Sequence, residues 1–218
     1  MKKKMINNNQ ITVSGELVSE FSFDHEVFGE KFYTTKLSVE RKSGNIDVLP
    51  ILISERIIDI KREWKGEMVK VYGQVRSYNK HEENKSRLIL SVFVREFEEI
   101  EFEHEEPGSG NDENNILLDG CICKKPSYRK TPLGREISDI LLAVNRPYGK
   151  SDYIPCIAWG RNAVYASGLE VGTRLQIEGR IQSREYQKRI SDGECETRTA
   201  YEVSISRLEV AEDEQSKN

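Results

Sequence analysis

Three aromatic side chains stand among charged residues in the segment NRPYGKSDYIPCIAWG, residues 145–160. Tyr148, Tyr153 and Trp159 are large and flat, and Arg146 and Lys150 beside them are cationic. An aromatic ring that stacks on an unpaired base contributes roughly 1–3 kcal/mol, whichever base it is, and nearby cations attract phosphates. The chemistry that this mixture suits is contact with a single nucleic-acid strand. Ordinary packing inside the protein is the alternative for each ring taken alone.

Composition narrows the class of protein. Of 218 residues, 37% are hydrophobic and 32% are charged, and the formal net charge is −4. No apolar run approaches the length of a membrane span. The start, MKKKMINNNQ, lacks an apolar stretch after its lysines, so we expect no secretory signal and a cytoplasmic protein with reduced cysteines. We expect no membrane partner.

Catalytic and metal-binding patterns are not found. Cys121 and Cys123 have the spacing of one strand face, no Cys-x-x-Cys pair occurs, and His25, His81 and His104 all lie in the first half. These features argue against a metal site. With no phosphate-binding glycine loop and no nucleophile beside a base, we expect neither a cofactor nor an enzyme.

The chain is an internal duplication. A shift of 105 residues, or 106 after one insertion, aligns the two halves. The matched pairs include Gly15 with Gly120, Gly44 with Gly149, Pro50 with Pro155 and Gly66 with Gly172. Such self-similarity indicates two domains of one fold. We predict an N-terminal domain over 1–102, an acidic and glycine-rich linker over 103–114, a C-terminal domain over 115–210 and a short polar tail over 211–218.

Each copy reads as short alternating strands bounded by turn residues. In the second copy these are NILLDGCIC, EISDILLAV, DYIPCIA, TRLQIEGRIQSREY and TAYEVSISRLEV. One helix candidate lies between the third and fourth strands, RNAVYASGL in the second copy and ERIIDIKREW in the first. This order predicts an all-β chain of two tandem OB-fold five-stranded barrels, each with one short helix between strands 3 and 4.

The second copy resembles the bacterial single-stranded-DNA-binding proteins over nearly its whole length. The matching stretches are NILLDG, TPLGREISDILLAVNR, YIPCIAWG, GTRLQIEGRIQSREY and TRTAYEVSI. The resemblance implies base stacking by aromatics of three elements of this copy: the hairpin between its second and third expected strands, the third strand, and the hairpin between its fourth and fifth strands. It adds Tyr186 to the three rings above. The predicted DNA-binding residues are Tyr148, Tyr153, Trp159, Tyr186, Arg146, Lys150, Arg161, Arg184, Arg129 and Lys130.

The first copy departs from this pattern at the stacking positions. Ser43, Val48, Ser54 and Lys80 stand where the second copy has its four rings. The charge is uneven too, because residues 115–210 hold 15 Lys and Arg against 12 Asp and Glu, whereas residues 1–110 hold 17 against 20. We therefore expect the second domain to bind the strand and the first to serve as a scaffold or assembly domain.

The resulting prediction is sequence-tolerant, non-catalytic binding of single-stranded DNA in replication, repair or recombination, with single-stranded RNA left open as a ligand. The resemblance implies a homodimer that brings four OB-folds together, and the segment EFEEIEF, residues 96–102, either contributes to that contact or closes the first barrel. The alternative function is an adaptor of the primosome type that acts mainly through protein contacts. The end of the chain, AEDEQSKN, lacks the hydrophobic tip by which family members recruit replication and repair enzymes, so such partners are not assigned.

Overall fold

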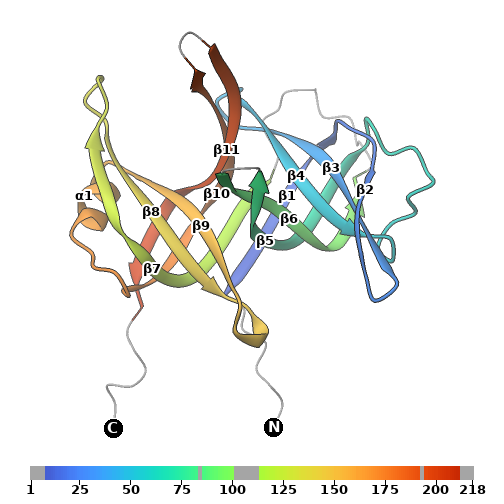
Figure 1. Cartoon of the computed structure of the whole chain (residues 1–218), viewed down its shortest axis with the longest axis horizontal. Coiled ribbons are helices and arrows are strands. Elements are labelled where there is room, and N and C mark those ends of the chain that lie inside the picture. The colour runs from blue at the N-terminus through green and yellow to red at the C-terminus, as the bar shows by residue number, and fades with distance from the viewer. Residues whose placement is uncertain (1–7, 83–84, 101–112, 192–193, 212–218) are drawn as a thin grey trace, which may run out of the picture.

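The computed structural model describes residues 8–82, 85–100, 113–191 and 194–211, and nearly all of them lie in strands or tight turns (Figure 1). The alternation seen in the sequence is the reason. In β4 (Ile46–Ser54), Leu49, Ile51 and Ile53 point inward and are at most 1% exposed, while their neighbours face outward. Among the described residues, no helix is long and apolar enough to cross a membrane.

The first half of the chain forms a closed barrel. Its strands are β1 (Asn9–Leu17), β2 (Ser22–Val27), β3 (Glu30–Glu40), β4, β5 (Met68–Glu82) and β6 (Lys85–Glu99). Antiparallel pairs β1–β3, β3–β4, β1–β5 and β5–β6, with the parallel pair β4–β6, complete the ring. The strand β2 extends β3 outward as a hairpin, and all its residues are exposed.

The second half repeats this barrel. Its elements are β7 (Asn114–Lys130), β8 (Glu136–Asn145), the 3-10 turn η1 (Pro147–Gly149), β9 (Ser151–Trp159), α1 (Arg161–Ser167), β10 (Arg174–Ser191) and β11 (Glu194–Val210). The pairs β7–β8, β8–β9, β7–β10 and β10–β11 are antiparallel, and β9–β11 is parallel. The two halves thus share one topology, which confirms the prediction of an all-β chain of tandem OB-folds.

The predicted helix is present in the second barrel and absent from the first. In α1, Ala163 and Ala166 are fully buried, and their small side chains let the helix lie close to the barrel. Residues 55–67 instead form successive turns. There the Asp59 carboxylate accepts the backbone N–H of Lys61 at 3.0 Å, and bonds from an Asp side chain to nearby backbone compete with helix formation. The carbonyl of Asp59 also accepts the indole N–H of Trp64 at 2.8 Å. The prediction of one helix in each barrel was therefore wrong for the first.

The predicted linker falls mostly outside the described residues, as does the predicted tail beyond residue 211. At the described edge, Asn114 already belongs to β7, and the backbone N–H of Glu113 donates to the Ser14 hydroxyl at 2.7 Å. The second barrel therefore begins one residue before the predicted boundary. The boundary at residue 102 stays a prediction.

The two barrels are joined into a single eleven-stranded sheet. Their first strands pair with each other, β1 antiparallel to β7, with Asn9 opposite Leu118 and Val13 opposite Asn114. Figure 1 shows the barrels side by side, with the β10–β11 hairpin rising at the top between them. Within the first barrel, β1 pairs with β3 only at Glu16 and Leu17. An unpaired stretch of strand exposes backbone hydrogen-bonding groups, and β7 covers such a stretch of β1 over Asn9–Val13.

Candidate nucleic-acid interface

The outer face of β9 carries two of the predicted stacking residues. Tyr153 is 45% exposed and Trp159 is 37% exposed, whereas Ile154, Cys156 and Ala158, which alternate with them, are buried. The β8–β9 register runs from Ile137 opposite Trp159 to Asn145 opposite Ser151 without a bulge. The two rings therefore share a face, as their even spacing predicts.

Trp159 is held in place by its neighbour on β11. Its indole Nε1–H donates to the Ser204 hydroxyl at 3.1 Å. The ring keeps an accessible surface while its polar group is satisfied, so no hydrogen bond is lost when a base covers the exposed part. This geometry suits a stacking platform.

Tyr148 lies at the other end of β9, at the tip of the hairpin that joins β8 to β9. It is 92% exposed, and its φ of 69° is followed by a φ of 72° at Gly149. A left-handed conformation is uncommon for a residue with a large side chain and marks local strain. Lys150, next to the tip, is also exposed. The hairpin thus presents a ring and a cation to solvent together.

A groove of about 850 Å³ opens beside β9. Its walls are β6 of the first barrel and β7, β8, β9 and the β10–β11 hairpin of the second. Five cations line it: Arg87, Arg129, Arg184, Lys188 and Arg198. Tyr186 and Tyr201 add rings, and Asp139 and Glu202 add negative charge. A groove with an excess of cations and two rings matches what a single strand requires.

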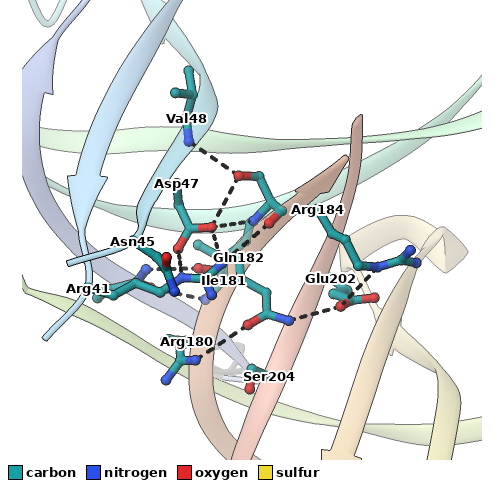
Figure 2. Close-up of polar contacts among 12 residues, drawn as sticks. Arg41, Asn45, Asp47, Val48, Arg180, Ile181, Gln182, Arg184, Glu202 and Ser204 are labelled. Atoms are coloured by element: carbon teal, nitrogen blue, oxygen red, sulfur yellow. Dashed lines mark hydrogen bonds and ion pairs between the residues drawn. The ribbon is translucent and has the colours of Figure 1, made fainter. Parts of the chain in front are cut away.

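The charges in the groove are only partly compensated. Arg129 pairs with Asp139 at 3.2 Å, and both side chains are nearly half exposed. Arg184 lies 3.8 Å from Glu202 and 5.9 Å from the ring centre of Tyr186. Figure 2 shows Arg184 reaching past Glu202, whose carboxylate also accepts the Gln182 amide at 2.9 Å. Exposed ion pairs contribute about 0–1 kcal/mol, so a phosphate can replace Asp139 as the partner of Arg129.

Arg146 is directed elsewhere. Its guanidinium donates to Asp152, through Nε at 2.5 Å, and to the carbonyl of Ser77 in the first barrel at 3.1 Å. Asp152 has no exposed surface, so its charge needs these partners. We therefore assign Arg146 to the contact between the barrels. The phosphate contact predicted for it has no support in these bonds.

The same contact occurs a second time with the barrels exchanged. Asp47, also fully buried, accepts Arg41 Nε at 2.6 Å and the backbone N–H of Ser183 at 2.6 Å. Figure 2 shows Asp47 beside Arg41 and facing the strand of the other barrel. Hydrogen bonds to Asp47 raise the pKa of Arg41. The barrel contact thus has an approximate two-fold symmetry that follows the internal duplication.

The predicted residues do not form a single cluster. The structure brings Arg129, Arg184 and Tyr186 together in the groove. Lys130 pairs with Glu136 at 3.6 Å near one end, and the exposed Arg161 begins α1. Tyr148 and Lys150 occupy the hairpin tip.

Sequence reasoning missed four groove residues: Arg87, Lys188, Arg198 and Tyr201. Lys188, Arg198 and Tyr201 lie on the two strands that carry the resemblance, and alternation from Tyr186 along β10 would have pointed to Lys188. Arg87 carries no such signal, because it comes from the first barrel. Its Nη2 donates to the Thr199 carbonyl at 2.7 Å, a contact that only the placement of the two barrels creates.

Metal binding has no geometric basis in the part of the chain that the structure describes, where no three His, Cys, Asp or Glu side chains are grouped to hold an ion. All four cysteines are free thiols. Burial raises the pKa of the Cys156 thiol, so this sulfur is protonated and serves as an apolar core group.

Comparison with known proteins agrees with this geometry. Residues 113–211 match the model of the Single-strand binding protein family. Single-stranded DNA-binding protein 2 of Listeria innocua is 36% identical over 87 residues, which are 37% of this chain and 54% of that protein. Single-stranded DNA-binding protein A of Bacillus subtilis is 35% identical over 81 residues, 34% of this chain and 47% of that protein. The match thus spans about half the length of these relatives.

Among solved structures, the wild-type single-stranded DNA binding protein from Thermus aquaticus superposes with a TM-score of 0.75 over 96% of both chains. Its sequence identity is 19%. At this identity the likeness shows the shared fold, including the tandem arrangement of two barrels.

Proposed function

We propose, because residues 113–211 match the model of the Single-strand binding protein family, that this protein binds single-stranded DNA and catalyses no reaction. The observation that carries the proposal is the exposed row of Tyr153 and Trp159 beside a groove lined by five cations. Rings receive bases and cations receive phosphates. Both contacts are independent of base identity, so binding is tolerant of sequence.

The second barrel provides the main surface. A strand that passes the tip of the β8–β9 hairpin meets Tyr148 and then Tyr153 and Trp159 along β9. The groove continues this path past Tyr186 towards β6 of the first barrel, where Arg87 lies. Processes that expose single strands, namely replication, repair and recombination in the cytoplasm, are the setting that we propose.

Tryptophan fluorescence tests the proposal directly. Trp64 is 6% exposed in the first barrel, while Trp159 is 37% exposed on the proposed platform. Titration with oligo(dT) should quench Trp159, and a duplex of equal length should not. Titration with oligo(rU) compares the affinity for single-stranded RNA with that for single-stranded DNA. Absence of quenching and of binding with every ligand would refute the proposed function.

We also propose a homodimer that assembles four barrels. Within the segment 96–102, Phe97 packs edge-on against Trp64 of the first barrel, with ring centroids 5.2 Å apart, so this ring is used inside the barrel. Residues 101 and 102 lie outside the described part of the chain. Light scattering at micromolar concentration should give twice the 25.1 kDa of one chain. A monomer mass with intact single-strand binding would contradict the dimer.

The adaptor function is a second candidate, favoured by one observation. The β2–β3 hairpin of the first barrel exposes Phe23, Val27 and Phe28, the last completely. An exposed apolar patch often marks a protein contact. Removal of these side chains should leave oligo(dT) binding unchanged under the main proposal, and the fluorescence titration above separates the two functions.

A further inference from the structure

Corresponding positions on the outer faces of the two barrels can be compared strand by strand. In the second barrel, Trp159 of β9 lies opposite Ile137 of β8. In the first, Ser54 of β4 lies opposite Phe32 of β3. In the second barrel the aromatic residue of this pair is on the third barrel strand, β9, whereas in the first barrel it is on the second barrel strand, β3.

The neighbouring strand on the other side shows the same exchange. Ile157 of β9 pairs with Ser204 of β11, and Leu52 of β4 pairs with Phe93 of β6. Ser204, which supports the Trp159 indole, therefore corresponds to Phe93. Where the second barrel places one ring on its middle strand, the first places a ring on each flanking strand.

These two rings form a layer on the first barrel. The centroids of Phe32 and Phe93 are 5.9 Å apart at an interplanar angle of 33°. Between their strands, Ser54 belongs to the outward set of β4 and yet is 4% exposed. Its hydroxyl donates to the Glu30 carboxylate and accepts the backbone N–H of Arg56. The first barrel has thus kept an aromatic surface at the place where alignment shows only serine.

Basic and acidic side chains border the two rings. The His25 ring stacks on Phe32 at 4.9 Å and 11°, and the Arg95 guanidinium lies 4.7 Å from the ring centre of Phe93. Arg56 is mostly exposed nearby, 3.4 Å from Glu30. His25 also contacts Asp24 at 2.5 Å. Cations are therefore within reach of a phosphate, with Asp24 and Glu30 opposing them.

We propose that Phe32 and Phe93 form a second base-stacking platform, in the first barrel, for an unpaired base of a single strand. The proposal rests on the proposed function, because the ligand is the same strand. Phe32 and Phe93 are both half-buried. A cation over a ring at the protein surface contributes about 0.5–1 kcal/mol, whereas a stacked base contributes about 1–3 kcal/mol. A base can accordingly displace Arg95 from the Phe93 face, and Arg95 then remains close enough for a phosphate.

A new fluorophore at the platform provides the test. Trp159→Phe removes the reporter of the second barrel, and Phe93→Trp in that background adds one to the first. Oligo(dT) long enough to reach both barrels should quench the double variant and should leave the Trp159→Phe protein, which retains buried Trp64, nearly unchanged. Equal fluorescence changes in the two proteins would overturn the proposal.

Affinity provides a second readout. Phe93→Leu keeps an apolar side chain but removes the ring, so it should weaken binding of long oligo(dT) roughly 5- to 150-fold. Oligonucleotides of roughly 8 nucleotides, short enough for one OB-fold, should bind the second barrel with unchanged affinity. Phe28→Ala is the matched control, since this fully exposed ring of the same barrel lies at a turn.

The outcomes separate the two proposals. If the wild-type protein binds no single strand, the proposed function fails. If wild type binds and Trp159→Ala weakens it while Phe93→Leu changes neither affinity nor length dependence, only the second platform is refuted. Thermal unfolding of each variant identifies any loss that comes from the fold.

Discussion

The Asp152 carboxylate of the second barrel accepts the backbone N–H of Ser77 in the first barrel at 2.6 Å. Arg76 and Arg146, one from each barrel, neutralise the same carboxylate. Its counterpart, Asp47, accepts Ser183 in the same manner. One buried acid from each copy therefore holds the other copy, and the duplicated chain folds as a single unit.

Asp152→Ala should destabilise the whole protein. The change leaves two guanidinium groups without their shared partner, and we expect a loss of about 3 kcal/mol in the free energy of unfolding, the lower end for a broken buried pair because both arginines reach solvent. Urea unfolding measures it. Asp119→Ala, which removes a surface pair with Arg174, should cost below about 1 kcal/mol. Similar losses in both variants would contradict the role given to Asp152.

Trp159→Ala should weaken binding of oligo(dT) by about 1–3 kcal/mol, the contribution of one lost stack. Ser54→Ala, at the corresponding position of the first barrel, should change binding little, because Ser54 is buried and its hydroxyl donates to Glu30. Fluorescence anisotropy of a labelled oligonucleotide gives both affinities. Tyr165→Ala, an exposed ring on α1, is the control, and equal losses from Trp159→Ala and Ser54→Ala would exclude the expected asymmetry.

Binding should weaken with salt, with a slope of about 0.7 in log K against log salt for each phosphate contacted. Arg184→Gln and Lys150→Gln should each reduce this slope. Arg207→Gln, an exposed residue paired with Glu209, should not. Arg146→Gln should lower stability and leave the slope unchanged, since its charge is used between the barrels. A flat slope in the intact protein would show that phosphate contacts contribute little.

Low pH should weaken the ion pair between Lys70 and Glu113, which lies just before the first strand of the second barrel. A hydrogen bond from Lys70 lowers the pKa of Glu113, so the folded state favours the ionised carboxyl. Its stabilisation is present above the ordinary glutamate pKa of about 4.3 and disappears as pH falls through the lowered value. Glu113→Gln should therefore unfold at a lower temperature than wild type at pH 7, and the difference should shrink steadily as pH falls below about 4.3. A difference that persists in acid would exclude the ion pair as its cause.

The sequence by itself determined the strands, the duplication and the row of rings on β9. These depend on local rules: alternation sets which side chains face outward, and the even spacing of Tyr153 and Trp159 survives in a strand without a bulge. The helix candidate RNAVYASGL is likewise present, as α1. The helix expected over residues 55–64 does not form, because local bonds within that segment, such as the one from the Lys61 backbone N–H to the Asp59 carboxylate, compete with a helix.

Only the tertiary structure decided how the copies meet and which residues share a surface. The sequence predicts that Arg146 contacts phosphate, whereas in the structure it bonds to the carboxylate of Asp152 and the carbonyl of Ser77. Arg87 enters the groove from the other barrel. Phe32 and Phe93 meet across β4 although 61 positions separate them in the chain. Sequence alignment compares single positions, whereas a surface is built from several strands. An aromatic residue that lies on a neighbouring strand therefore escapes the alignment, and only the folded barrel shows that it occupies the same part of the surface.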